Sequence, residues 1–299
     1  MRAITTIAKA ATRATWPLTR LDRNGDLTGP VVLCYHRVLP RPANSQSPRY
    51  AVTPQQFREQ MSLLVAEGFS SLSLDDLRGA VPEVPPRSVI VTFDDGFADN
   101  YLSAWPIARE LGITPNLFLC TGLLDGARLE AFDPQTLADR TSQRHFPHLW
   151  RALTWDEVRE MGRAQVGLGF HSHSHRNYGR LRGPEIAADA ERGLSRFANE
   201  VGSRPSAFAF PYGHHGSYSP EAISVLRKQG LEIFFTTEMG RTSLSSNRPI
   251  SRFVIHPEDD IQSFRRKLFG GYDWVGRLRR AAYSFRAAVR PELHEPSRA

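Results

Sequence analysis

The stretch Val91-Thr92-Phe93-Asp94-Asp95-Gly96 decides how this chain is organised. Residues 88–93 form a short apolar run rich in β-branched side chains, which predicts a buried strand. The strand ends in two adjacent carboxylates and a glycine. Adjacent acids at the end of a buried strand repel each other and lose hydration, so a bound metal or a reaction is the usual reason for such a pair. The alternative is an aspartate that caps the next helix beside a turn glycine.

On either side of this strand, apolar runs alternate with capped amphipathic segments. Thr53-Pro54 and Thr154-Trp155 are two of the predicted helix starts, each with a glutamine or glutamate as the capping-box partner. The alternation predicts an α/β fold with parallel strands and helical crossovers, either open or closed into a barrel. The predicted strands are residues 31–35, 88–93, 116–121, 166–170, 206–210, 231–236 and 251–255. Helices are predicted near residues 54–67, 101–111, 154–161, 184–201 and from 220, with an irregular segment at 122–150.

The 299 residues carry a net charge of +7 and a pI near 9.8, which favours anionic partners without choosing among them. Cys34 and Cys120 lie in apolar runs, so we expect two core thiols and no disulfide framework. We expect a basic lead-in at 1–29, a barrel domain at 30–260 and a basic amphipathic segment at 261–299. Because charges interrupt the N-terminal apolar run, we expect no cleavable signal peptide and a cytoplasmic protein, peripheral at the inner membrane face.

Polar residues follow several of the predicted strands directly. They are His36, Asp94-Asp95, His171 and Pro211-Tyr212, and in parallel α/β folds such strand ends converge on one face. In His171-Ser172-His173-Ser174-His175, the outer histidines are spaced to meet one ion from a compact loop, although such a run is often a solvated loop. Two imidazoles and one carboxylate form a divalent-metal set that leaves a position open for water.

Proton energetics suggest how two adjacent aspartates divide the work. A carboxylate of pKa ~3.9 that takes a proton from bulk water works uphill by ~12 pKa units, or roughly 16 kcal/mol. Water bound to a metal, with a pKa of about 7, reduces this to ~3 units, or roughly 4 kcal/mol. One aspartate as a metal ligand and its neighbour as a base is therefore workable, and successive side chains of an extended chain point in opposite directions.

Three motifs in order, Thr92-Phe93-Asp94-Asp95-Gly96, His171-Ser172-x-x-His175 and Phe210-Pro211-Tyr212-Gly213, resemble the polysaccharide deacetylases of carbohydrate esterase family 4. Leu33-Cys34-Tyr35-His36-Arg37-Val38 and Leu153-Thr154-Trp155 resemble the branch that includes poly-N-acetylglucosamine deacetylases. The resemblance covers roughly residues 30–255. It implies a distorted (β/α) barrel with about seven parallel strands and metal-dependent hydrolysis of an acetyl group on a sugar.

By position, the resemblance implies a role for each motif residue. Asp94 would be the general base, and Asp95, His171 and His175 would hold a divalent metal, for which we expect Zn²⁺ with Co²⁺ or Ni²⁺ as alternatives. Tyr212 would donate its backbone N–H to the oxyanion, with Pro211 and His36 lining the substrate site. We also expect Phe97, beside the first motif, to line the cleft.

The sequence departs from the family pattern in two places. The arginine that usually opens the third motif and pairs with the base is Ala209 here, and Arg252 is the candidate to replace it. The last motif, which supplies a histidine as general acid, has only a weak counterpart at residues 254–257. His36, His214 and His215 are other candidates, so the general acid is open.

We expect an N-deacetylase that acts on N-acetylhexosamine units of a polysaccharide or its lipid-linked precursor. The alternatives are a glycan-binding relative that has lost its chemistry, and a metal amidase acting on a non-sugar C–N bond. Residues 264–269 and 277–286 interleave arginines with apolar residues, which predicts either a helix on an anionic membrane or a tail helix packed on the barrel. No nucleic-acid partner is expected because no recognition motif accompanies the charge.

Overall fold

This computed structural model describes residues 29–41, 50–78, 84–125, 140–242, 244, 248–276 and 278. The strands are β1 (Val31–Tyr35), β2 (Arg37–Val38), β3 (Ala51–Val52), β4 (Ser70–Ser71), β5 (Ser88–Asp95), β6 (Pro115–Leu119), β7 (Gly167–Phe170), β8 (Ala207–Ala209), β9 (Ile233–Phe235) and β10 (Phe253–Val254). The helices are α2 (Pro54–Ala66), α3 (Trp105–Glu110), α4 (Arg140–His145), α5 (Trp155–Arg163), α6 (Gly183–Val201), α7 (Pro220–Lys228) and α8 (Ile261–Leu268). Shorter turns are η1 (Asp75–Leu77), η2 (Asn100–Ala104), η5 (Pro147–Leu149) and η6 (Tyr178–Arg180), of which η2 is π-helical.

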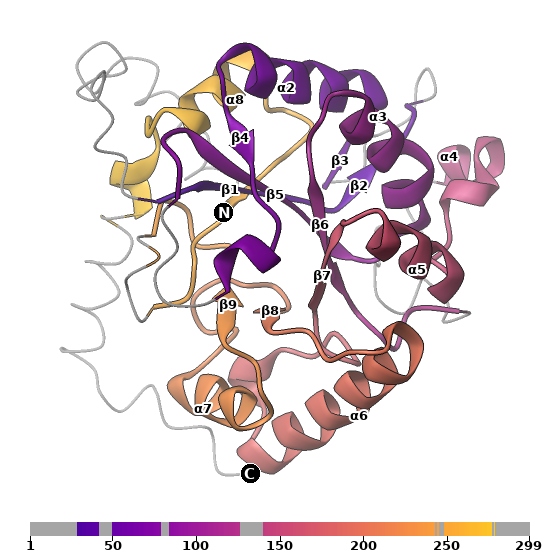
Figure 1. The fold of residues 1–299 in the computed structure, drawn as a ribbon, viewed down its shortest axis with the longest axis vertical. Helices are drawn as coiled ribbons and strands as arrows, with labels where there is room; N and C mark the ends of the chain where they lie inside the picture. Colours follow the sequence, from indigo (N-terminus) through magenta and orange to yellow (C-terminus); the bar gives the residue numbers. More distant parts are fainter. Residues whose placement is uncertain are drawn as a thin grey trace.

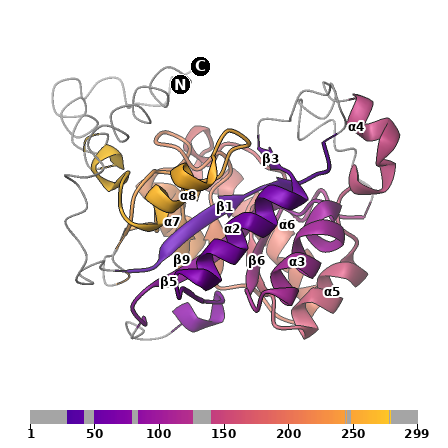
Figure 2. The same cartoon turned by 90° about the horizontal axis from the view of Figure 1, so that it is seen from above.

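The main sheet is parallel and curls into a partial barrel. Its strand order is β10-β1-β5-β6-β7-β8-β9, with β4 paired beside β5. A parallel bridge joins Phe235 of β9 to Ile250, which precedes β10 in the chain. The two edge strands of the sheet, β9 and β10, therefore approach each other. The helices lie around the outside of the strands (Figures 1 and 2). The predicted α/β barrel with about seven parallel strands is confirmed.

The two predicted capping boxes are present and fix where their helices begin. The Thr53 hydroxyl accepts from the N–H of Gln56 at 3.1 Å, and the Gln56 side chain accepts from the Thr53 N–H at 3.0 Å. Thr154 and Glu157 make the same reciprocal pair at the start of α5. Each box satisfies two backbone donors that a helix start otherwise leaves without partners.

The segment after β10 contributes to the barrel core. In α8 and the turn after it, Phe264, Leu268, Tyr272 and Val275 are buried in the same apolar cluster as the central strands. For residues 261–276 the apolar face therefore packs on the barrel, as in the tail-helix alternative. Membrane contact through the basic residues that follow stays a prediction, and residues 279–299 lie outside the described part. Within the described residues, no helix combines the length and apolarity that a membrane crossing needs.

The predicted irregular segment contains α4 and η5 in its described part, and one buried arginine ties it to the barrel. Arg37 pairs with Asp99 at 2.9 Å and donates to the carbonyl of Leu149 at 2.8 Å. Its guanidinium carbon lies 4.5 Å from the ring centre of Phe97 and 4.1 Å from that of Trp150. Phe97 is thus buried beside Arg37, and the expectation that it lines the cleft is wrong because this cation–π contact holds it in the core.

Candidate active site

The carboxyl ends of the parallel strands gather the predicted site residues. Asp94 and Asp95 close β5, His171 follows β7, and His36 follows β1. Tyr212 lies in the turn after β8, and its ring centre is 5.1 Å from that of His175. Because neighbouring parallel strands end on one side of the sheet, residues far apart in the sequence meet there. The structure therefore brings these predicted residues to one face.

Asp95, His171 and His175 form a compact ligand set. The Asp95 Oδ1 atom lies 3.3 Å from Nε2 of His171 and 3.2 Å from Nε2 of His175. The other ring nitrogen of His171, Nδ1, is 2.8 Å from the carbonyl of Ala209. In the neutral ring that contact makes Nδ1 the donor and leaves Nε2 as a lone pair facing Asp95. Ligand atoms on a tetrahedral ion with bonds of 2.0–2.1 Å are separated by about 3.3 Å.

An unsatisfied oxygen supports the fit of a cation. The Asp95 Oδ1 atom is buried and has no hydrogen-bond partner within the described residues. A buried anionic oxygen facing two imidazole nitrogens is the donor set of a divalent metal. The three residues fit the expected Zn²⁺, and they fit Co²⁺ or Ni²⁺ equally well.

Asp94, by contrast, is held by a buried arginine. Each Asp94 oxygen accepts from a terminal nitrogen of Arg252 at 2.7 Å, and both side chains are at most 2% exposed. The Arg252 Nε donates to the carbonyl of Thr236 at 3.1 Å, which fixes the plane of the guanidinium. Burial acts to raise the pKa of Asp94, but the Arg252 charge lowers it overall, so Asp94 is ionised at neutral pH. The structure places Arg252 where it can replace the arginine missing at Ala209.

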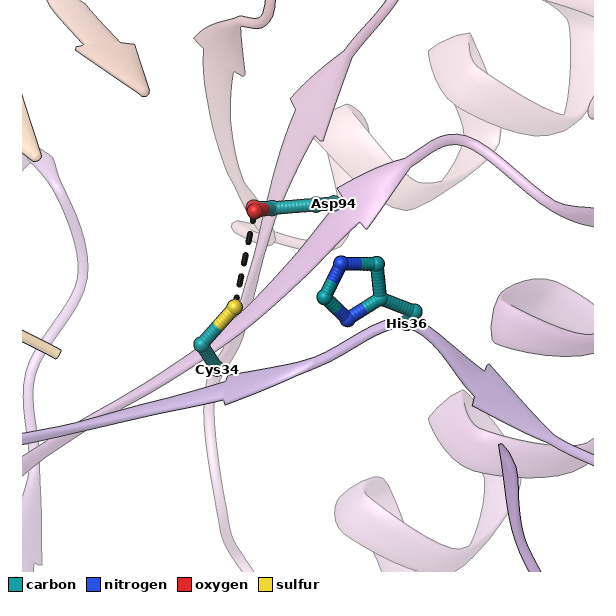
Figure 3. A group of neighbouring side chains, drawn as sticks. All are labelled: Cys34, His36 and Asp94. Atoms are coloured by element: carbon teal, nitrogen blue, oxygen red, sulfur yellow. Dashed lines mark hydrogen bonds between the residues drawn. The ribbon is translucent and has the colours of Figure 1, made fainter. Parts of the chain in front are cut away.

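Cys34 and His36 lie on the same side of Asp94 (Figure 3). The Cys34 thiol donates to Asp94 Oδ2 at 3.4 Å, and the His36 Nδ1 atom is buried without a hydrogen-bond partner in the described part of the chain. The three could in principle hold a second ion. However, burial raises the pKa of the Cys34 thiol well above its usual value, and Arg252 occupies both oxygens of Asp94. A resident metal therefore fits Asp95 and its histidines better. Burial also lowers the pKa of His36, which favours the neutral ring.

The loops that present these groups adopt left-handed backbone conformations. Asp95, Ser172, His175 and Tyr212 have φ values of 77°, 69°, 54° and 64°. Non-glycine residues reach this region at a cost of order 1 kcal/mol or more, and the cost persists only where the surroundings impose it. The Ser172 hydroxyl accepts from the N–H of His175 at 2.9 Å. This hydrogen bond closes the loop of residues 171–175, which we call the histidine loop. The backbone strain thus coincides with the three motifs.

The Tyr212 turn leaves one backbone donor available. Its carbonyl accepts from the Thr237 hydroxyl at 2.8 Å, whereas its N–H makes no hydrogen bond within the described residues. Pro211 is buried beside it, and Tyr212 is 53% exposed. An unpaired N–H on a fixed turn next to His175 is the geometry that an oxyanion donor needs.

Asp189 of α6 supports the histidine loop, and the sequence reading missed it. Its carboxylate accepts from the His173 N–H at 3.1 Å, from the Ser174 hydroxyl and from the Tyr178 hydroxyl at 2.7 Å. His173 itself turns away from this candidate ligand set, with Nδ1 3.0 Å from the Thr121 hydroxyl. One feature of the sequence could have indicated this role: Asp189 lies next to the apolar stripe of the predicted helix 184–201, where a charged side chain needs a partner.

The remaining candidate histidines lie on two sides of the site. His214 is exposed, with its ring centre 6.4 Å from that of Tyr212, and His215 lies 4.0 Å from Glu238. His256 belongs to a row of rings: its centre is 5.6 Å from that of Tyr50, which in turn stacks 4.8 Å from His36. The row places both His36 and His256 on the β1 side of the site.

Comparison with known proteins agrees with this geometry. The family model described as polysaccharide deacetylase matches residues 82–234, just over half of the chain. The chain belongs to the polysaccharide deacetylase family. This membership confirms the resemblance drawn from the motifs and the expectation of a deacetylase enzyme of this family.

Among similar proteins is the poly-beta-1,6-N-acetyl-D-glucosamine N-deacetylase of Escherichia coli strain K12, 24% identical over 272 residues that cover 80% of this chain. The present chain spans only 38% of the length of that Escherichia coli protein. The Staphylococcus epidermidis protein of the same name is 22% identical, with 75% of this chain and 78% of that protein covered. The solved structure of IcaB from Ammonifex degensii superposes with a TM-score of 0.62 and 26% identity, covering 81% of this chain and 97% of that one.

Proposed function

We propose that this deacetylase is a metal-dependent hydrolase that removes N-acetyl groups from N-acetylhexosamine units of a polysaccharide or its lipid-linked precursor. The observation that carries the proposal is the division between two adjacent carboxylates. Asp95 faces the Nε2 atoms of His171 and His175, whereas Asp94 is paired on both oxygens with Arg252. This division supports a role for one carboxylate in holding a cation and for the other in accepting a proton. The relatives named as N-acetylglucosamine deacetylases support the choice of substrate.

Asp95, His171 and His175 would hold the ion, with Zn²⁺ as the proposed metal and Co²⁺ or Ni²⁺ as alternatives. A divalent ion bound there would lower the pKa of a water molecule toward 7 and polarise the acetyl carbonyl. Asp94 accepts the proton of the attacking water, and Arg252 keeps this carboxylate ionised and oriented while it does so. The Tyr212 N–H donates to the carbonyl oxygen as negative charge develops on it.

The leaving amine requires a proton, and His36 is the proposed donor. Its ring lies close to Asp94 (Figure 3), and its Nδ1 atom is buried without a partner among the described residues. A proton that reaches Asp94 from water can pass to this imidazole and then to the sugar nitrogen as the C–N bond breaks. His256, at the far end of the same row of rings, is the alternative donor.

The binding-only alternative rested on the arginine missing at Ala209 and on the lack of a clear last-motif histidine. The bidentate Arg252–Asp94 pair supports hydrolysis instead, because it supplies the same charge to the same carboxylate. A cytoplasmic location at the inner membrane face remains a proposal that the basic composition motivates, as does contact with anionic lipid.

The proposal is tested by measuring acetate release from a panel of N-acetylated glycans by apo protein to which Zn²⁺, Co²⁺ or Ni²⁺ is returned. We expect one free amine on the glycan for each acetate released, and no release by the apo protein. Binding of glycans by the metal-loaded protein without acetate from any member of the panel would favour the binding-only alternative.

A further inference from the structure

A polar groove opens directly beside the ligand set. It has a volume of about 470 Å³ and is lined by Ser174, His175, Arg176, Asn177, Arg180, Leu181 and Tyr212. The volume lies in the range of small-molecule sites. Because His175 and Tyr212 belong both to the groove and to the catalytic face, a sugar next to the one being deacetylated would enter this groove.

The groove has an excess of positive charge. Arg180 is exposed and forms no ion pair in the described part of the chain, while Arg176 pairs with Glu185 at 3.0 Å. Of the other acids near the groove, Asp189 is used by Ser174 and by groups beneath the histidine loop, and Asp95 faces the imidazoles of His171 and His175. One guanidinium is therefore left without a counter-charge at the groove, and a concave site of one sign concentrates ions of the opposite sign.

The turn that carries Arg180 is held rigidly. The Gly179 N–H donates to the carbonyl of Ser217 at 3.0 Å and lies 2.9 Å from Asn177 Oδ1. A Cβ atom at Gly179 would lie 2.2 Å from the carbonyl oxygen of Gly216, so the two loops touch along their backbones. With its oxygen engaged, Asn177 retains its amide N–H groups as donors, since they have no partner in the described residues. The groove thus offers a backbone held against the neighbouring loop, unpaired amide donors and positive charge.

We propose that this groove is a subsite for an anionic group, a phosphate or a carboxylate, on the sugar next to the N-acetylated one. The inference rests on the proposed function and narrows the substrate to an acidic glycan or a sugar linked to phosphate. The guanidinium of Arg180 binds the anion through charge-assisted hydrogen bonds, with Asn177 as a second donor. A sugar that has already lost its acetyl group carries an ammonium, which Arg180 repels, so the groove also selects against deacetylated neighbours.

The test compares three ligands on the metal-loaded full chain by calorimetry and by initial rates. They are a neutral N-acetylglucosamine tetrasaccharide, a tetrasaccharide in which N-acetylglucosamine alternates with glucuronic acid, and an N-acetylglucosamine disaccharide that carries a diphosphate on its reducing-end sugar. At low salt we expect at least one anionic ligand to bind about fivefold more tightly than the neutral one, the size of a single exposed charge pair. Which anionic ligand shows the preference separates carboxylate from phosphate, and high salt should abolish it.

Arg180→Gln should remove this preference and raise the KM for the anionic ligand about fivefold. The matched control is Arg163→Gln, an exposed arginine at the end of α5 outside the groove, which should keep the preference. Equal binding of all three ligands to the unaltered protein, or an undiminished preference in Arg180→Gln, would overturn the proposal. The calorimetric arm needs no turnover, so absent acetate release with an intact anionic preference would refute the proposed function and leave the subsite standing.

Discussion

Removing the Arg252 guanidinium should expose how strongly the site depends on this one buried cation. Arg252→Met keeps an unbranched apolar side chain in a position that is fully buried, but it leaves Asp94 without its partner. Two hydrogen bonds of 2.7 Å are lost, and a carboxylate that is 2% exposed cannot recover them from water. Breaking a buried ion pair from one side costs about 3–5 kcal/mol of unfolding free energy.

The sign of the pH dependence follows from the same contact. In the unaltered protein the pKa of Asp94 is lowered, so the stabilisation is present at neutral pH and is lost as the pH falls through that pKa. In Arg252→Met, burial without a partner should raise the pKa of Asp94 above its unfolded value. The loss of stability relative to the unaltered protein should therefore be large at pH 7 and smaller near pH ~4, because a protonated Asp94 needs no guanidinium.

Urea unfolding of four proteins measures the effect: the unaltered chain, Arg252→Met, Asp94→Asn and the double variant. Because the double variant has no unpaired buried charge, its loss should fall short of the sum of the single losses by up to about 3 kcal/mol. Arg58→Met is the control, since the exposed Arg58 also makes a bidentate pair, with Glu110 at 2.6 and 2.8 Å, and should leave stability almost unchanged. A loss below about 1 kcal/mol in Arg252→Met, or strict additivity, would refute the reasoning.

Three further results are expected. His171→Gln should bind less than one equivalent of Zn²⁺ by elemental analysis because it removes one of three ligands, and unchanged stoichiometry would exclude this metal site. Tyr212→Gly should raise the midpoint of thermal unfolding, because glycine adopts φ of 64° without the roughly 1 kcal/mol strain, and a lower midpoint would show that the ring stabilises the turn. Gly167→Ala should lower stability by about 1–3 kcal/mol, because the new Cβ would lie 2.0 Å from Asn116 Oδ1, and a neutral result in denaturant unfolding would contradict the packing of β6 on β7.

The candidate site residues at the strand ends could be predicted from the sequence because each motif is a short, continuous stretch of the chain. Asp94-Asp95 and the histidine run each follow a short apolar strand directly, and parallel topology alone brings such ends together. The sequence offered Arg252 as a candidate to replace the arginine missing at Ala209, but its pairing with Asp94 spans 158 residues. It depends on the register of β10 against β1, in which Cys34 lies beside Val254, and no local pattern encodes that register.

Several long-range contacts were not predicted, because they depend on strand register or on packing between distant segments. Cys34 was interpreted as a core thiol, and its burial agrees, but its contact with Asp94 follows only from the register of β1 on β5. The burial of Phe97 beside Arg37 depends on a long-range cation–π contact that sequence spacing does not reveal. The pairing of β2 with β3 was also not predicted, because each strand is too short to show a periodic hydrophobic pattern.

The most direct test of the two-carboxylate site is acetate release by Asp94→Asn loaded with one equivalent of Zn²⁺, measured beside the unaltered protein on N-acetylglucosamine oligomers. Metal occupancy is determined on the same samples, because Asp94 is proposed as the base and Asp95 as the ligand. We expect Asp94→Asn to retain the metal and to release acetate at least about 10²-fold more slowly, the size of a general-base contribution. Full metal occupancy with undiminished acetate release would contradict the assignment of Asp94 as the base.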